Sequence, residues 1–254
     1  MNTAGIDIGS ITTKAAILRD GTVLGTRVSF TGYNAEFAGR RIFDEILTDL
    51  GLDATDITKV IATGYGRNAA KFADKAVTEI ICHGVGAHHL NPQVRSVIDI
   101  GGQDSKVIVV DAAGKVKDFV MNDKCAAGTG RFLEVMARAL EVELDNFGAL
   151  SLKADNPAKI SSLCTVFAES EVISLIAKGE NRENIIAGIH DAVASRVAAL
   201  ANRLGVKAPI MMTGGVAKNS GVVKAMESRL GPIQVLHEAQ VNGAIGAAVL
   251  AMGL

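Results

Sequence analysis

Two stretches of the chain carry the same pattern of acidic, glycine and basic residues. The sequence is IDIGSITTKAAIL over residues 6–18 and IDIGGQDSKVIVV over residues 98–110, and the two align without a gap, with Asp7 on Asp99. An Asp-x-Gly turn after a strand exposes a carboxylate, and its glycine lets backbone N–H groups approach a phosphate. Carboxylates beside a polyphosphate usually act through Mg²⁺. The duplication therefore predicts two phosphate turns that clamp one triphosphate from both sides.

Polar residues after each aspartate extend these predicted contacts. They are Gly9, Ser10, Thr12, Thr13 and Lys14 in the first copy, and Gly101, Gly102, Gln103 and Asp104 in the second. One such turn could be an ordinary hairpin. Two ungapped copies, with a later double glycine at Gly214 and Gly215, favour a nucleotide site.

Two cysteines stand before predicted helices, Cys125 in MNDKCAAGTGRF and Cys164 in SSLCTVFAESEV. A helix N-terminus favours negative charge, so a thiolate or a thiolate-bound cluster suits these positions. A [4Fe–4S] cluster needs four thiolates, which a symmetric dimer sharing one cluster would supply. Taken alone, a cysteine is more often a small buried apolar residue than a cluster ligand. The third cysteine, Cys82, is predicted to be a packed helix residue.

The elements that must position these residues follow from hydrophobic periodicity. Each copy of the duplicated stretch begins a meander of three short strands, and helices follow each meander. Helices are predicted over residues 35–50, 68–90, 165–178 and 183–204, after the turn Gly128-Thr129-Gly130, after the double glycine, and at the C-terminus. The pattern predicts an α/β fold of two similar lobes, residues 1–95 and 96–254, with the C-terminal helix able to pack back on the first lobe.

Composition excludes several other classes of protein. The 254 residues are 48% apolar with a net charge of −1, which is typical of a soluble globular protein. The lack of basic excess and the scarcity of aromatic residues argue against nucleic-acid binding. No apolar run approaches membrane-spanning length, and the N-terminus has no basic-then-apolar signal, so we expect a cytoplasmic protein without a membrane partner. Three cysteines are too few, and odd in number, for a disulfide framework.

Three motifs resemble those of the actin-like ATPase fold, which sugar kinases and chaperone ATPases share. IDIGSITTK, IDIGGQDSK and MMTGGVAKN are similar to its phosphate-1, phosphate-2 and adenosine motifs, and no Walker A loop occurs. The resemblance implies that Asp7 and Asp99 hold Mg²⁺ and that Gln103 helps to place the attacking water. It also implies nucleotide contacts at Gly214, Gly215, Val216 and Asn219, with Gln240 and Gly243 near the adenosine.

Longer stretches are similar to the ATP-dependent activator family of 2-hydroxyacyl-CoA dehydratases, which also includes ATPase subunits of benzoyl-CoA reductase. They are IATGYGRN, ADKAVTEI, VIDIGGQDSKVI, MNDKCAAGTGRFLEVMA, CTVFAESEVISLIAKG, IIAGIHDAVASR and MTGGVAKN, and the likeness covers nearly the whole chain. The resemblance implies that Cys125 and Cys164 ligate one [4Fe–4S] cluster per homodimer, bridging two identical subunits. It assigns no cluster role to Cys82.

The expected function is ATP-driven one-electron donation. Ferredoxin or flavodoxin would reduce the cluster, and ATP binding and hydrolysis would pass the electron to a partner iron–sulfur enzyme, first among them a 2-hydroxyacyl-CoA dehydratase. Alternative acceptors are benzoyl-CoA reductase and a double-cubane cluster protein. A small-molecule kinase of the same fold and a nucleotide switch without redox chemistry remain alternatives, although no inserted segment suggests an acceptor-substrate pocket.

Overall fold

The computed structural model describes residues 1–161 and 164–254, and the chain in it divides into two compact units. The first unit comprises Met1–Val97, Ile108–Phe119 and Leu236–Leu254, and the second comprises Ile98–Val107 and Val120–Val235. Both units are discontinuous in sequence, and the C-terminal segment is part of the first.

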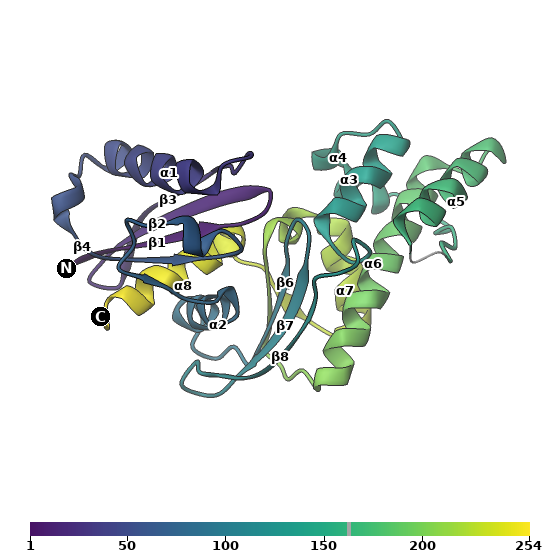
Figure 1. The fold of residues 1–254 in the computed structure, drawn as a ribbon. Helices are drawn as coiled ribbons and strands as arrows, with labels where there is room; N and C mark the ends of the chain where they lie inside the picture. Colours follow the sequence, from purple (N-terminus) through teal and green to yellow (C-terminus); the bar gives the residue numbers. More distant parts are fainter. Residues whose placement is uncertain (162–163) are drawn as a thin grey trace. The chain divides into compact units, whose positions relative to one another are not determined.

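The first five-stranded sheet has the order β3-β2-β1-β4-β5 (Figure 1). Its strands are β1 (Asn2–Ile8), β2 (Thr12–Arg19), β3 (Thr22–Phe30), β4 (Ile57–Thr63) and β5 (Lys75–Ala76). The first three form the predicted antiparallel meander, and β4 pairs with β1 in parallel, which sets Thr63 opposite Asp7. The carboxylate of Asp7 therefore lies at the edge of the sheet where the parallel strands β1 and β4 end.

Helices cover both faces of this sheet. On one face α1 (Ala35–Leu50) buries Ile42, Phe43 and Ile46 against alternate residues of β1 and β2. On the other face lie α2 (Glu79–Leu90) and α8 (Asn242–Ala251), which bury alanine and isoleucine side chains. Alternate β2 residues therefore enter different cores, as the two-residue period of a strand requires. Short 3₁₀ turns lie at Ala54–Asp56, Arg67–Ala69 and His237–Gln240.

The predicted helix over residues 68–90 is correct only in its second half. The first half contains a 3₁₀ turn and the short strand β5, and α2 begins at Glu79. Asp74 explains the difference, because its carboxylate accepts hydrogen bonds from Val60 N and Lys59 Nζ, both at 2.8 Å. These long-range bonds hold the segment as an edge strand beside β4, which local periodicity does not reveal.

The second sheet has the order β10-β9-β6-β7-β8. Read from its other end, β8-β7-β6-β9-β10, it repeats the order of the first sheet, and Figure 1 labels β6, β7 and β8. Its strands are β6 (Ser96–Ile100), β7 (Ser105–Val110), β8 (Val116–Asn122), β9 (Ile210–Thr213) and β10 (Ile233–Gln234). In each sheet the first strand of a meander lies beside a later strand that returns through helices. The duplication in the sequence is therefore a duplication of architecture, and the predicted α/β fold class is confirmed.

Helices also accompany the second sheet. They are α3 (Gly130–Ala139), α4 (Leu144–Ser151), α5 (Thr165–Ala177), α6 (Arg182–Leu204) and α7 (Ser220–Leu230), with a 3₁₀ turn at Gly215–Lys218. The predicted stripe on α6 is buried at Ile185, Ile189, Val193 and Val197. Helix α4 was not predicted. Within the described ranges, no helix combines the length and apolar character that crossing a membrane requires.

Candidate functional site

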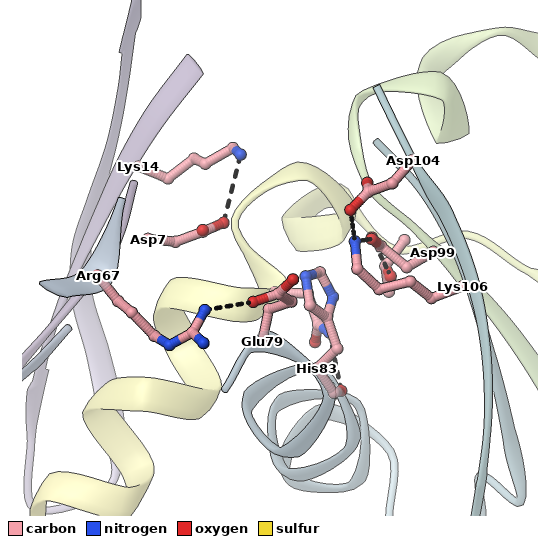
Figure 2. Close-up of polar contacts among 10 residues, drawn as sticks. Asp7, Lys14, Arg67, Glu79, His83, Asp99, Asp104 and Lys106 are labelled. Atoms are coloured by element: carbon pink, nitrogen blue, oxygen red, sulfur yellow. Dashed lines mark hydrogen bonds and ion pairs between the residues drawn. The ribbon is translucent and has the colours of Figure 1, made fainter. Parts of the chain in front are cut away.

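The first phosphate turn (residues 8–13) places Asp7 and Lys14 opposite each other on β1 and β2. Asp7 is only 5% exposed, and its Oδ2 lies 3.3 Å from Lys14 Nζ. Figure 2 marks this ion pair with a dashed line. A buried carboxylate is costly unless it is paired, so the strand register that aligns the two residues also stabilises the charge.

Main chain from two other segments lies directly against Asp7. Gly64 has φ +83°, and a Cβ there would lie 2.4 Å from Asp7 Oδ1. A Cβ on Gly243 would lie 3.2 Å from Asp7 Oδ2 and 2.9 Å from His83 Nε2. A Cβ at either position would crowd the carboxylate, so both glycines border Asp7. The family resemblance had placed Gly243 near the adenosine, and that contact stays a prediction.

Hydrogen bonds fix the segments that surround Asp7. Asn242 Nδ2 donates to His83 O at 3.0 Å, which links the start of α8 to α2. Arg67 Nη1 donates to Gly64 O at 3.0 Å and lies 3.3 Å from Glu79 Oε2 (Figure 2). The TGYGR turn is thereby tied to the first residue of α2, so the glycine beside Asp7 is held in place.

The second phosphate turn (residues 100–105) has a more buried charge cluster. Asp99 is 2% exposed, and its Oδ1 accepts a hydrogen bond of 2.9 Å from Thr213 Oγ1. Lys106 Nζ lies 3.3 Å from Asp99 Oδ2 and 2.7 Å from Asp104 Oδ2 (Figure 2). Gly214 has φ +87°, and a Cβ there would lie 2.9 Å from Asp99 Oδ1.

The two turns are built alike, and the likeness includes residues outside the two aligned stretches. In each, a Thr-Gly pair after the neighbouring parallel strand, Thr63-Gly64 or Thr213-Gly214, brings a positive-φ glycine against the aspartate. Sequence reasoning recognised the second pair and missed the role of the first, although IATGYG and MMTGGV share the signal. It also assigned no site role to Lys106, although Lys106 aligns with Lys14.

The other residues of the first turn that were predicted to contact the nucleotide differ in their exposure. Thr13 is buried and its hydroxyl lies 2.9 Å from Thr31 Oγ1. Gly9 N donates to Thr12 O at 3.1 Å, which closes the hairpin, and Ser10 is exposed. Ser10 is therefore the hydroxyl of this turn that is most open to a ligand.

The second turn is bonded to the start of α3. The N–H groups of Gly130 and Arg131 donate to Gly101 O at 2.9 Å and Gly102 O at 2.8 Å. The first two residues of α3 thus use these amides to hold the turn. Gln103 is exposed at its tip.

The residues predicted to lie near the adenosine belong to different elements of the fold. Gly215 and Val216 begin the 3₁₀ turn after β9, while Gln240 ends another 3₁₀ turn in the first unit. Asn219 caps α7, because its Oδ1 accepts from Val222 N at 3.1 Å. The Asn219 amide is therefore already engaged by the protein.

The three cysteines occupy different environments. Cys164 is the exposed N-cap residue of α5, as the sequence predicted. Cys125 is half-buried, and the turn 126–129 separates it from α3, so it does not stand immediately before the helix. Cys82 is buried in α2, and burial raises the pKa of its thiol to about 12.

Two further observations bear on a metal site near the cysteines. Asn122 Nδ2 donates to Cys125 O at 2.8 Å and to Ala127 O at 3.0 Å, which shapes the loop around Cys125. Ser162 and Leu163, which precede Cys164, lie outside the described residues. Among the residues described, no three His, Cys, Asp or Glu side chains gather as a metal site within one chain.

A buried histidine supports the capping residue Asn219. Asn219 Nδ2 faces His190 Nε2 at 3.2 Å, so Nε2 acts as the acceptor and the neutral ring carries its proton on Nδ1. Phe147 packs edge-on against this ring, with centroids 5.2 Å apart. Burial lowers the pKa of His190 to about 4, because the charged ring would lose its hydration.

We therefore expect His190 to make stability fall in mild acid. In the unfolded protein His190 becomes protonated below about pH 6.5, whereas in the native protein it stays neutral down to about pH 4. The free energy of unfolding therefore declines as the pH falls through this window. The loss between about pH 7 and 5 should be on the order of 2 kcal/mol, measured by urea unfolding. His190→Gln, whose amide oxygen can accept from Asn219, should lack this loss. An equal decline in both proteins would contradict the prediction.

Known proteins resemble this chain over nearly its whole length. A model of the BadF/BadG/BcrA/BcrD ATPase family matches residues 4–251. The chain is 50% identical over 253 residues to the activator of lactoyl-CoA dehydratase from Anaerotignum propionicum, covering 99% of this chain and 97% of that protein.

Two solved structures match over nearly the whole chain. Component A of (R)-2-hydroxyglutaryl-CoA dehydratase from Acidaminococcus fermentans has a TM-score of 0.97 at 48% identity, covering 100% of this chain and 98% of that one. The activator of 2-hydroxyisocaproyl-CoA dehydratase from Clostridium difficile, solved with bound ADPNP, has a TM-score of 0.94 at 45% identity, covering 100% and 95%. A ROK-family glucokinase from Streptomyces griseus, at 15% identity and a TM-score of 0.59, shares the fold alone.

The repeated sheets and the paired Asp-x-Gly turns define an α/β protein of the actin-like ATPase fold. Within that class the chain belongs to the BadF/BadG/BcrA/BcrD ATPase family. The family resemblance predicted from the motifs is thereby confirmed.

Proposed function

We propose that the chain is an ATP-dependent electron donor that activates a 2-hydroxyacyl-CoA dehydratase. The observation that carries this proposal is an exposed cysteine at the N-terminus of a helix whose outer face is apolar, in a chain of this ATPase family. Relatives at 44–50% identity are named activators of such dehydratases.

The apolar face of α5 supports a homodimer. Of its thirteen residues only Ala168 and Val172 are buried. Its exposed apolar side chains are Val166 (67%), Phe167 (67%), Ile173 (56%) and Ile176 (45%). Such a face is unfavourable in water, and Cys164 begins the same helix. A second copy is the occupant we propose, because each chain offers two suitable cysteines and a cluster needs four thiolates.

The cysteines fit a shared [4Fe–4S] cluster chemically. Cys164 lies where backbone N–H groups and the helix dipole favour negative charge. Cys125 is partly accessible, while Cys82 is a buried thiol with a raised pKa and fits no ligand role. When bound, the cluster would supply one-electron redox chemistry.

The two phosphate turns fit ATP with Mg²⁺. Asp7 and Asp99 offer buried carboxylates with oxygen donors of the kind that Mg²⁺ prefers. Glycine at positions 64, 214 and 243 keeps side chains away from these carboxylates, and Gln103 is exposed for orienting a water. The ammonium groups of Lys14 and Lys106 add positive charge for phosphate oxygens.

Helix α3 offers a route by which nucleotide state could reach the cluster. Its first two amides hold the second phosphate turn, and Cys125 lies in the loop that leads into it. A helix moves as a rigid element, so a shift of the turn would move the start of α3 and the loop together.

The energy scale explains why ATP would be used. For one electron, ~59 mV is a tenfold change in equilibrium, so raising an electron by ~300 mV needs about 7 kcal/mol. A single rearranged hydrogen bond contributes only about 1 kcal/mol. Ferredoxin or flavodoxin would be the donor, and benzoyl-CoA reductase or a double-cubane protein are alternative acceptors.

The test is ATP-dependent activation by protein purified without oxygen. We expect a brown protein whose absorbance bleaches on reduction, and which, with reductant and ATP, activates at least one of the lactoyl-, 2-hydroxyglutaryl- and 2-hydroxyisocaproyl-CoA dehydratases. ADP in place of ATP is the matched control. A colourless protein that takes up no iron on reconstitution and phosphorylates a sugar would instead support a kinase.

A further inference from the structure

We propose that Glu171 is a positioning residue for the cluster ligand Cys164, because its carboxylate holds the chain that leads into this cysteine. The inference rests on the proposed cluster and adds to it a residue for which the family resemblance implied no role. Glu171 belongs to α5, the helix that Cys164 begins.

The carboxylate of Glu171 binds both the main chain and the side chain of Ser161. Ser161 N donates to Oε1 and to Oε2 at 3.0 Å, and Ser161 Oγ donates to Oε1 at 2.9 Å. Hydrogen bonds to an ionised acceptor are about twice as strong as those between neutral groups. The position of Ser161 on α5 is therefore fixed in direction as well as in distance.

The helical period explains why a residue so far along α5 can reach this segment. Cys164 and Glu171 are seven positions apart, which is close to two turns at about 3.6 residues per turn, so they share one side of the helix. Side chains on a helix also lean toward its N-terminus. Glu171 thus extends back toward the end of α5 at which Cys164 lies, and it meets Ser161, three positions before the cysteine.

The chain before Ser161 is attached to a different helix, α6. Ala158 N donates to Asn184 O at 2.9 Å, and a Cβ at Gly188 would overlap Ala158 O. The segment therefore lies directly against α6 at Ala158 and reaches α5 at Ser161. Glu171 makes this second attachment, at the last described residue before the cysteine.

Cys164 needs such support because it is an exposed residue at the start of its helix. A ligand that must stay at one vertex of a cluster depends on partners that orient it, and removing such a partner typically lowers metal affinity about 10–100-fold. The attachment through Glu171 limits how far the chain entering Cys164 can move. It should therefore slow the departure of this thiolate from iron.

Glu169 provides a control within the same helix. It carries the same charge as Glu171 and stands two positions earlier in α5. Residues two positions apart on a helix do not face each other, so Glu169 lies on a different side of α5 from the one that holds Ser161. Neutralising either glutamate changes the charge of α5 equally, whereas only the change at position 171 removes the attachment.

The test measures how fast the reduced, cluster-loaded protein loses iron to a chelator. The parental protein, Glu171→Gln, Glu171→Asp and Glu169→Gln are prepared without oxygen and compared. Both variants at position 171 should lose iron at least about tenfold faster than the parent, and Glu169→Gln should match the parent. Glu171→Asp keeps the charge on a side chain one methylene shorter, so it separates reach from charge.

Two measurements on the iron-free proteins separate positioning from stability. Exchange of the Ser161 amide hydrogen should be faster in both variants at position 171, because this N–H loses its acceptor. The equilibrium constant for unfolding in urea should change by less than about fivefold, because the lost contact lies at the surface.

The inference fails if both variants at position 171 lose iron at the parental rate, and the proposed cluster then stands. It also fails if Glu169→Gln loses iron as fast as they do, or if the unfolding constant rises by the same factor as the rate of iron loss. A parental protein that takes up no iron overturns the proposed function, and the inference with it, before any variant is compared.

Discussion

Cys164→Ser is expected to contain almost no iron when purified without oxygen, whereas the parental protein should contain about four irons per homodimer. Serine is an excellent N-cap residue, so α5 should begin as before, and any loss reflects the missing thiolate rather than a melted helix. The measurements are iron and sulfide content, visible absorbance and helix content.

Cys125→Ser should lose the cluster to the same extent, because only two of the four thiolates would remain in each homodimer. Cys82→Ser is the matched control. It changes a buried thiol in α2 with no expected ligand role, and it should keep its iron. Full iron content in either Cys125→Ser or Cys164→Ser would refute a cluster shared through these two residues.

Features fixed by short-range pattern were predicted well from the sequence. The two meanders follow from alternating apolar residues broken by glycine turns, and the strands lie where the pattern placed them. The stripe on α6 follows from the helical period, and Cys164 was placed at a helix start by its position alone. In each case neighbouring residues carry the information.

Features fixed by distant contacts were not predicted. The short strand β5 depends on Asp74 reaching back to β4, and α4 is an eight-residue helix with only three buried residues. Gly64 lies beside Asp7 because β4 returns next to β1, a pairing that no local pattern reveals. The bridging position of Lys106 likewise needs the fold to bring Asp99 and Asp104 together.

Asn219 illustrates how a motif can hide two roles. The motif resemblance assigns it to the nucleotide, and that contact stays a prediction. The structure uses its amide to cap α7 and to meet a neutral histidine. A motif residue can therefore shape the turn that a ligand contacts, and its type alone does not separate the two roles.

Asp7→Asn is expected to lower the rate of ATP hydrolysis by about 10²–10³-fold while changing ADP affinity by less than about tenfold. In the proposed function the carboxylate of Asp7 acts on the metal and the transferring phosphate, whose charge changes during the reaction, while the predicted adenosine contacts lie elsewhere in the chain. Asparagine has the same shape, and Lys14 remains partly open to water, so the fold should tolerate the change. Single-turnover hydrolysis and ADP titration measure the two effects.

The control is Asp20→Asn, which makes the same substitution at an exposed position at the end of the β2 strand that carries Lys14. It should hydrolyse ATP at the parental rate. Asp99→Asn should behave like Asp7→Asn, because Lys106 keeps Asp104 as a partner and the second turn stays paired. The cluster spectrum should be unchanged in both variants, since neither aspartate is a proposed ligand of the cluster. Parental turnover in Asp7→Asn would show that the duplicated turn does not bind the transferring phosphate, whatever the fate of the cluster.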